Sequence, residues 1–266
     1  ANTEFELLTG NTLGFLSAGT TAFQLYIHGQ MPSLVSNLKA EGYSGNKAMH
    51  PFNPYNYNRP AVYKDFGFTD FIDKFDFPKN VKRVREYISD EANVDRIISE
   101  YEKNRKKTDQ PFYMYNMTIQ NHSPYDKDAA NFKQPIKIES SKYDAEANRY
   151  LNLIKYSDDS LKQLTGYFEK CKEPTIILFL GDHQPRLTDE FMNKITNGQY
   201  QTWSSEQMMK RYQVPFVIWA NYDIKEQHIE KTSMNYIQSI LTKTAGVKMT
   251  GYQRFLNEVR KEVPTI

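Results

Sequence analysis

The sequence predicts an α/β fold, in which helices cover both faces of a parallel or mostly parallel sheet and so make three layers. The main observation is that segments with a helical spacing of apolar residues alternate with short apolar runs typical of strands. The chain has 266 residues, a length that suits one large domain or two small ones, and the alternation through the whole chain favours one. Because 39% of the residues are hydrophobic and 25% are charged, a folded core is expected rather than disorder. We therefore expect a single domain over residues 1–266.

In the first half of the chain the pattern predicts two helices and two strands. A helix is expected over residues 31–39, with a proline near its start and a glycine after its end. A strand is expected over residues 43–49, a second helix over 90–107 and a second strand over 111–119.

In the second half, a long helix is expected over residues 144–170, followed by strands over 175–180 and 214–220 and a helix over 232–244. Both strands are apolar on both faces, which is typical of strands buried in the middle of a sheet. The long helix carries an apolar stripe formed by Leu151, Ile154, Leu161, Leu164 and Phe168. Asp158 falls on that stripe, so we interpret it as a buried structural hydrogen-bonding group.

Charge and composition exclude several classes of protein. The net charge is +2, and the densest basic cluster, 103–107, ends a predicted helix, where cations complement the helix dipole. A nucleic-acid partner is therefore not expected. The single cysteine, Cys171, allows no internal disulfide. No run approaches the roughly 20 apolar residues that a membrane helix needs, but the chain opens with Ala1 and not with Met, which indicates a piece of a longer protein.

Histidines stand just after three of the predicted strands. His50, His122 and His183 follow the strands 43–49, 111–119 and 175–180, and the chain has only five histidines. In parallel sheets the active site lies beyond the carboxyl ends of the strands. We therefore expect these side chains to meet at one edge of the sheet.

Asp182 and His183 carry the strongest local signal. Gly181 before them lets the chain turn sharply at the end of the strand. A carboxylate oxygen and an imidazole nitrogen side by side can converge on one cation. A loop turn with an aspartate cap would give the same pattern, and spacing alone does not decide between the two.

The other candidates are weaker when each is taken alone. His122, in the sequence QNHSPY, could hold a phosphate oxygen or donate a proton, although a buried, hydrogen-bonded histidine explains it better, and His50 is weaker again. Arg59 lies near the end of the rigid polar loop PFNPYNYNRP and could fork onto a phosphate with Tyr57 beside it, or could merely cap the next helix. No Ser/His/Asp order, P-loop or dinucleotide fingerprint is present. His28 and His228 lie in polar surroundings typical of a surface.

Considered together, these residues resemble a known family. The opening segment ANTEFELLTG resembles the stretch that follows the catalytic threonine in lipoteichoic acid synthases and related phosphoglycerol transferases of the alkaline phosphatase and sulfatase superfamily. His50, Tyr57 and Arg59 match in spacing the family's residues around the phosphoglycerol pocket. QNHSPY and GDHQP match the loops that carry, at His122 and at Asp182–His183, a substrate contact and a metal pair, and VPFVIWANYDI is similar to the strand that follows. The resemblance runs from Ala1 to about Gly251.

The resemblance implies an alkaline-phosphatase-like α/β/α sandwich and a metal-dependent phosphoglycerol transferase. In this family a threonine alkoxide attacks a phosphodiester and forms a phosphorylated threonine, with the help of a divalent cation, typically Mn²⁺. Arg59 and His122 would bind phosphate and glycerol oxygens, and His50 and Tyr57 would line the same pocket. Asp182 and His183 would hold the ion.

The same resemblance places two of the family's functional residues outside this chain. The threonine would lie immediately before Ala1, and a metal-binding glutamate would lie on a strand further upstream. Glu4 cannot replace that glutamate, because it lies one helical turn past the nucleophile. We therefore expect the 266-residue chain to be inactive, to bind metal weakly and to leave an unpaired position in its sheet. The full protein is expected to be anchored in the cell membrane by N-terminal helices, with this domain, itself soluble, on the extracellular face.

The pocket departs from that of the best-known lipoteichoic acid synthases. Tyr57 stands where the family has tryptophan, Phe52 stands where an acidic residue is expected, and Gln184 and Pro185 follow the GDH motif. Because of these differences, the resemblance does not identify the donor or the acceptor. Our first interpretation is glycerol phosphate from phosphatidylglycerol as the lipid-linked donor, and a teichoic acid chain or another cell-wall glycan as the acceptor.

Two alternatives remain. One is a sulfatase or a phosphoethanolamine transferase of the same superfamily, and the other is a non-catalytic module that binds wall polymer through a tyrosine-rich cleft. The residue before Ala1 would discriminate among them, because a sulfatase needs a Cys or Ser there and a binding module needs no threonine.

Overall fold

The structure, a computed structural model, describes residues 1–17, 19–139, 143–196 and 198–266. Its strands are β1 (Ser44–Met49), β2 (Asp70–Ile72), β3 (Arg83–Val84), β4 (Tyr87–Ile88), β5 (Phe112–Asn116), β6 (Ile176–Leu180) and β7 (Phe216–Ala220). Its α-helices are α1 (Asn2–Thr9), α2 (Ala22–Leu25), α3 (Leu34–Ala40), α4 (Arg59–Phe66), α5 (Asp90–Arg105), α6 (Ala145–Phe168), α7 (Asp189–Thr196), α8 (Ser205–Lys210), α9 (Ile237–Thr244) and α10 (Gly251–Glu262). Short 3₁₀ helices are η1 (Asn56–Asn58), η2 (Lys74–Asp76), η4 (Tyr200–Thr202) and η5 (Met234–Tyr236). Every helix in the described ranges is too short or too polar to span a bilayer.

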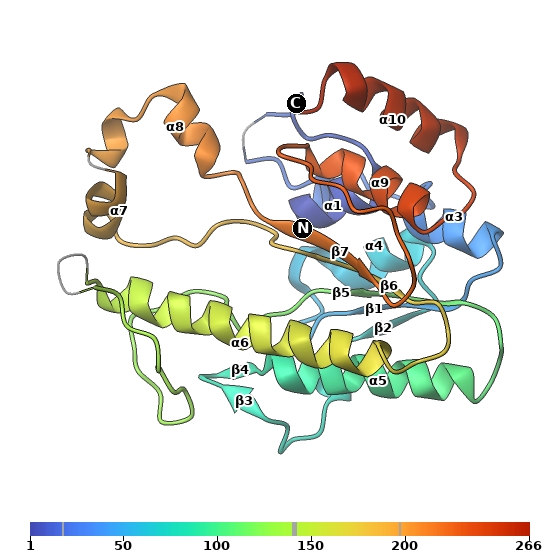
Figure 1. The fold of residues 1–266 in the computed structure, drawn as a ribbon, viewed down its shortest axis with the longest axis horizontal. Helices are drawn as coiled ribbons and strands as arrows, with labels where there is room; N and C mark the ends of the chain where they lie inside the picture. The colour runs from blue at the N-terminus through green and yellow to red at the C-terminus, as the bar shows by residue number, and fades with distance from the viewer. Residues whose placement is uncertain (18, 140–142, 197) are drawn as a thin grey trace.

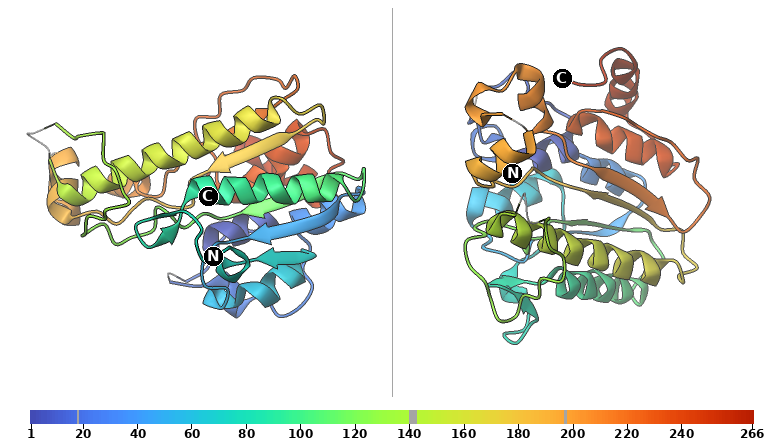
Figure 2. Two further views of the ribbon diagram at one scale, coloured as in Figure 1. Left: turned by 90° about the horizontal axis from the view of Figure 1, so that it is seen from below. Right: turned by 60° about the vertical axis from the view of Figure 1, so that its left-hand side comes forward.

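Strands form the middle layer between two layers of helices (Figures 1 and 2). The strands β2, β1 and β5 form a parallel sheet in that order, and β6 pairs with β7 in the antiparallel sense. Helices α5 and α6 cover one face, whereas α1, α4, α9 and α10 lie on the other (Figure 1). The arrangement confirms the predicted three-layer α/β fold with a parallel central sheet.

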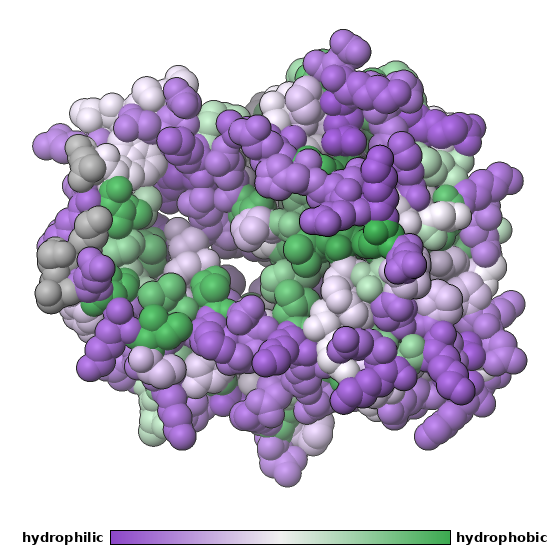
Figure 3. All heavy atoms as spheres, viewed as in Figure 1, coloured by the Kyte–Doolittle hydropathy of each residue, from purple (hydrophilic) through white to green (hydrophobic). Residues whose placement is uncertain are grey.

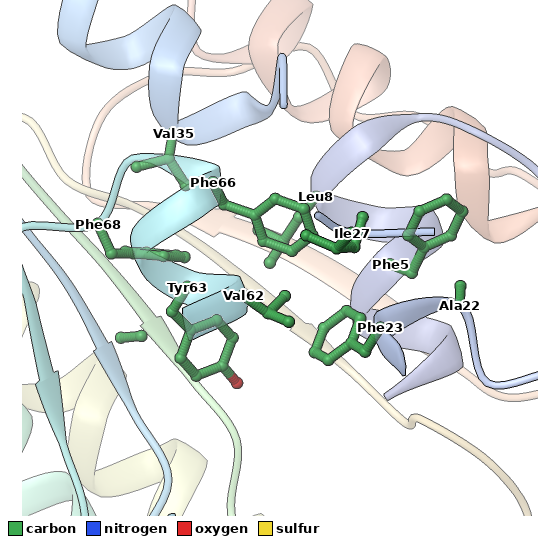
Figure 4. Close-up of a cluster of buried hydrophobic side chains, with 11 residues drawn as sticks. Phe5, Leu8, Ala22, Phe23, Ile27, Val35, Val62, Tyr63, Phe66 and Phe68 are labelled. Carbon is green, nitrogen blue, oxygen red and sulfur yellow. The ribbon is translucent and has the colours of Figure 1, made fainter. Parts of the chain in front are cut away.

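Alternation along the strands divides the core between the two faces of the sheet, because successive side chains of a strand point in opposite directions. Ala48 of β1 packs in the cluster that α1, α2 and α4 build around Phe23 and Phe66 (Figure 4). The next residue, Met49, packs instead with Ile88 and Ala92 on the α5 side. This alternation fixes the register of β1 and so fixes which residue, His50, leaves the strand at its carboxyl end.

The prediction that strands 175–180 and 214–220 lie buried in the middle of a sheet is wrong in this structure. Phe179 and Val217 are paired across β6 and β7, and their exposed fractions are 38% and 49%. The reason is that β6 pairs with β7 only, and, within the described residues, β5 and β6 belong to separate hydrogen-bonded sheets. The edge of β5 that faces away from β1 is therefore unpaired, and so is the edge of β6 that faces away from β7.

The apolar stripe predicted for the long helix is also partly wrong. Leu151, Ile154 and Asp158 are exposed, so Asp158 is not a buried structural group. The helix instead buries Asn148 and Asn152, whose amides hydrogen-bond the main chain of Ile136 and Ile138. The extended segment around Ile136 and Ile138 has no partner strand, so its main-chain groups need side-chain donors and acceptors. For this reason α6 buries polar residues on the face that contacts this segment.

Candidate active site

Glu4 and Arg59 form a buried ion pair between α1 and α4. Arg59 donates from Nη2 to Glu4 Oε2 at 2.9 Å and from Nε to Oε1 at 3.3 Å, and the Tyr63 hydroxyl donates to Oε1 as well. Burial would raise the pKa of Glu4, but the Ala1 amino group and the Arg59 guanidinium outweigh it and bring the pKa to about 2. Glu4 is therefore negatively charged, and its carboxylate holds the Arg59 side chain in place.

The Arg59 side chain keeps one nitrogen for other partners. Nη1 contacts only the Asn56 carbonyl, at 3.5 Å, in the described part of the chain. The ring of Tyr57 lies beside the guanidinium, with its centroid 5.2 Å from Cζ. Tyr57 adopts a left-handed backbone conformation with φ of 59°, and 43% of its side chain is exposed. Arg59 is the first residue of α4, which is close to the helix-capping position considered for it above. Its side chain, however, is buried.

His50 is buried next to Arg59 and is neutral at physiological pH. Burial first, and then the charge of Arg59, lowers its pKa to about 4. Its Nδ1 lies 3.1 Å from the carbonyl oxygen of Met117, which only an N–H can satisfy, so this contact assigns the proton to Nδ1. Nε2 is left as an acceptor, which suits a hydroxyl group better than a phosphate oxygen.

A row of aromatic rings connects His50 to His122. The ring centroids are separated by 6.0 Å from His50 to Phe52, 6.0 Å from Phe52 to Tyr87 and 6.1 Å from Tyr87 to His122. Phe52 and Tyr87 are half-buried and His122 is exposed. His122 thus lies at the same edge as His50, but it is not the buried histidine that its position alone favoured.

Asp182 and His183 lie where β6 ends, beside the first turn of α1. Thr3 donates from Oγ1 to the Asp182 carbonyl at 2.8 Å, which ties the two segments together. Nε2 of His183 lies 3.5 Å from Oδ1 of Asp182, and His183 Nδ1 lies 2.8 Å from the Gln184 carbonyl. Gly181 is closely packed here, because a Cβ would lie 3.1 Å from Cβ of Val214, which is tighter than an ordinary van der Waals contact.

The pair fits part of a cation site. Both side chains are exposed, and the 3.5 Å between the carboxylate oxygen and the imidazole nitrogen is short enough for both to bind one cation. Among the described residues no group of three or more His, Cys, Asp or Glu is arranged to hold a metal. Asp182 and His183 are thus the two ligands that the described residues bring together here, and the origin of further ligands stays a prediction.

A cleft of about 420 Å³ opens along the residues that follow His122 in the chain. It is lined by Ser123, Pro124, Tyr125, Glu146, Arg186, Leu187, Thr188 and Asp189. Thr188 donates to Oδ2 of Asp144 at 2.8 Å and so joins the starts of α6 and α7 across it. The cleft adjoins both site loops in the chain, because Ser123 follows His122 directly and Arg186 comes three residues after His183. The molecular surface is hollowed between the α7–α8 arm and the body (Figure 3).

Three residues of this region escaped the sequence analysis as parts of the site. Glu4 could have been found, because it shares a helix face with Leu7 and Leu8, where a charge signals a buried partner. Tyr63 and Arg85 carry no such signal, since the residues that they contact are distant in the sequence. His28 and His228 are exposed, as interpreted.

Comparison with known proteins gives independent findings. A family model described as Sulfatase matches residues 1–247. A putative cyclic beta-1,2-glucan modification protein of Rhizobium meliloti is 33% identical over 267 residues, covering 97% of this chain and 40% of that protein. The chain thus spans less than half the length of this curated relative.

Two solved structures share the fold. The phosphoglycerol transferase GacH of Streptococcus pyogenes, in complex with sn-glycerol-1-phosphate, superposes with a TM-score of 0.76 at 20% identity, covering 99% of this chain and 66% of GacH. The lipoteichoic acid synthase LtaP of Listeria monocytogenes gives a TM-score of 0.71 at 22% identity, covering 94% of this chain and 60% of LtaP.

Proposed function

Since the chain belongs to the sulfatase family, we propose that it is the catalytic domain of a metal-dependent phosphoglycerol transferase. It moves glycerol phosphate from a phosphatidylglycerol-type lipid to a glycan of the cell envelope, through a phosphothreonine. The names of the glucan-modifying relative and of GacH support the acceptor and the transferred group.

One observation carries the proposal: the hydrogen bond between Thr3 and Asp182 holds the start of α1 beside the Asp182–His183 pair. Glu4, on the same helix, positions Arg59. The free N–H groups at the start of a helix favour an anion. A threonine placed immediately before Ala1 would therefore stand among the cation-binding pair Asp182–His183, a helix start and an arginine, which are the surroundings that a phosphoryl group needs.

The proposed reaction has two displacements. The threonine oxygen forms a bond to phosphorus while the bond from phosphorus to the diacylglycerol oxygen breaks, and that oxygen takes up a proton. An acceptor hydroxyl then displaces the threonine. Nη1 of Arg59 and the ring of His122 bind the phosphate, and Nε2 of His50 accepts a hydrogen bond from a glycerol hydroxyl. Asp182 and His183 would hold a divalent cation, Mn²⁺ or another, which neutralises phosphoryl charge.

The cleft beside His122 supports a polyhydroxylated acceptor. Its lining offers the carboxylates of Glu146 and Asp189 and the hydroxyl of Ser123, all of which can accept hydrogen bonds from sugar hydroxyls. Its volume of about 420 Å³ lies within the range of small-molecule sites.

The unpaired edges of β5 and β6 support a strand upstream of Ala1. Tyr115 of β5 packs in the same hydrophobic cluster as Leu178 and Leu180 of β6, so the two strands share a covering layer although they are not paired. A strand inserted between them would end near the start of α1. We propose that it carries the remaining metal ligand and delivers the threonine.

The test is release of glycerol phosphate from phosphatidylglycerol vesicles by a protein extended upstream through the strand and threonine. We expect release that requires Mn²⁺ or another divalent cation, that is abolished by His183→Ala and Arg59→Ala, and that the exposed-histidine control His228→Ala leaves unchanged. The 266-residue chain should release none. An extended protein that is folded, binds Mn²⁺ and still releases nothing would refute the donor, and equal losses in all three variants would refute the assigned roles.

A further inference from the structure

Arg85 is a buried arginine in a backbone conformation that non-glycine residues rarely adopt. It lies in the turn between β3 and β4 with φ of 54°, and 9% of it is exposed. Its N–H donates to Oδ1 of Asn131 at 3.1 Å, and Nδ2 of Asn131 donates back to the carbonyls of Arg85 at 3.0 Å and of Arg83 at 3.1 Å. The surrounding structure therefore enforces this conformation, which aims the side chain at the neighbouring loop.

The guanidinium of Arg85 is bonded to three main-chain carbonyls of the loop that carries His122. Nη2 donates to the oxygens of Gln120 at 2.6 Å and of His122 at 2.8 Å, and Nη1 donates to the oxygen of Pro124 at 2.6 Å. A planar group with a fixed fork of donors can meet three carbonyls at once, whereas a lysine ammonium cannot match that geometry. Each bond is charge-assisted and therefore stronger than a bond between neutral groups.

The same hairpin holds the loop at a second point. The hydroxyl of Tyr87 donates to the carbonyl of Ser123 at 3.1 Å. The rings of Tyr87 and Tyr125 lie 5.2 Å and 5.7 Å from Cζ of Arg85. The His122 ring is exposed and lies against Tyr87, so the conformation of its main chain decides where the imidazole points.

We propose that Arg85 is a positioning residue for His122: it fixes the main chain of residues 120–124 and thereby aims the imidazole at the donor pocket. The inference rests on the proposed function, because His122 is given its role there. The inference adds Arg85 to the site as a residue that affects donor binding only through His122. Arg85 also sets one wall of the cleft, since Pro124 and Tyr125 line it.

The first experiment follows the imidazole itself. The chain has five histidines, so the C2–H resonances can be assigned by substituting each histidine in turn. Arg85→Lys should move the His122 resonance and leave that of His228 in place, whereas the control Arg83→Gln, an exposed arginine of the same hairpin, should move neither. An unmoved His122 resonance in a folded Arg85→Lys protein would overturn the proposal, whatever the protein binds.

The second experiment measures the affinity for sn-glycerol-1-phosphate in the presence of Mn²⁺. Arg85→Lys and His122→Ala should each weaken binding by roughly tenfold, and the double variant should be no weaker than either single variant, because both act through one imidazole. Additive losses would overturn the proposal, since they would mean that Arg85 acts independently of His122. If the unsubstituted chain and the extended protein both fail to bind glycerol phosphate, the proposed function fails, and the His122 resonance still decides the role of Arg85.

Discussion

Glu4 and Arg59 are a charged pair that the fold removes almost completely from water, with exposed fractions of 0% and 3%. Such a pair adds little net stability when intact, but removing one partner leaves a buried charge without compensation. The pair therefore has a second consequence besides positioning: it makes the start of α1 and the start of α4 depend on each other.

We expect Glu4→Gln to lower the free energy of unfolding by about 3–5 kcal/mol, because Arg59 would keep its charge in a buried site. Urea denaturation measures this change. Glu41→Gln serves as the control, since Glu41 is exposed after α3. Equal stability of the two variants would show that Arg59 finds another counter-charge.

The Glu4 carboxylate gives the 266-residue chain a pH dependence with a defined sign, because the Ala1 amino group and Arg59 both stabilise its charged form. The pKa of Glu4 is lowered from 4.5 to about 2 in the folded chain, so its contribution to stability is present above pH 4.5 and is lost as the pH falls through 2. Stability should therefore fall more steeply between pH 4.5 and 2 in the unsubstituted chain than in Glu4→Gln. Denaturation curves at several acidic pH values measure this slope, and parallel slopes would contradict the assignment.

The sequence predicts the site residues that follow the strands, but it does not predict the long-range contacts that fix site residues in place. His50, Asp182 and His183 follow β1 and β6 directly, and a periodic pattern locates the ends of such strands. Glu4 and Arg59 are 55 residues apart in the chain, and Arg85 and Gln120 are 35 apart. No local pattern reports contacts of that range, which exist only once the layers have packed.

At the scale of elements, the start of α5 is joined to α6 and to the His122 loop through one carboxyl group. Oδ2 of Asp90 accepts hydrogen bonds from Ser157 of α6 at 2.6 Å and from Nε2 of Gln120 at 3.3 Å, and the Asp90 N–H donates to Oε1 of Gln120 at 3.0 Å. Burial raises the pKa of Asp90 to about 6. This carboxyl group is thus protonated more readily in the folded chain than in the unfolded chain.

The Asp90→Asn variant should gain stability over the unsubstituted chain as the pH rises. A raised pKa means that the contribution of Asp90 is present below pH 3.8 and is lost as the pH rises through 6, and Asn does not titrate. The difference between pH 4 and pH 8 should be on the order of 2–3 kcal/mol. Chemical denaturation at both values measures it, with Asp95→Asn on the exposed side of α5 as the control. A difference that does not change with pH would show that Asp90 ionises normally.

The strands β6 and β7 show how far the sequence of a single segment can predict its structure. Residues 175–180 were recognised as a strand from their apolar sequence, and that strand exists. The exposure of this strand depends on which strands pair with it, and the sequence of one segment does not show which strands those are. The half-exposed Phe179 is thus a property of the sheet and not of the segment.

Extension of the chain upstream of Ala1 should slow amide hydrogen exchange in β5 and β6 and leave β2 unchanged. An inserted strand would pair the free edges of β5 and β6, whereas β2 already occupies the far edge of its sheet beside β1. Exchange followed by mass spectrometry on the 266-residue chain and the extended protein measures this directly. Slowed exchange confined to other segments would place the added residues elsewhere.

At the scale of the whole molecule, three layers bring the starts of α1 and α4 and the ends of β1 and β6 to one edge of the sheet (Figure 1). The alternation of segments and the positions of the histidines were sufficient to predict this convergence. They were not sufficient to predict the cleft beside His122, because its walls come from α6, α7 and the 120s loop, which approach one another only in the folded chain.

The most direct measurement is the identity of the covalent intermediate. The extended protein would be incubated with phosphatidylglycerol and Mn²⁺, digested, and mapped by mass spectrometry. We predict glycerol phosphate attached to the threonine immediately before Ala1, and no adduct when that threonine is replaced by alanine. Glycerol phosphate release that persists in the alanine variant, or an adduct on any other residue, would contradict the account.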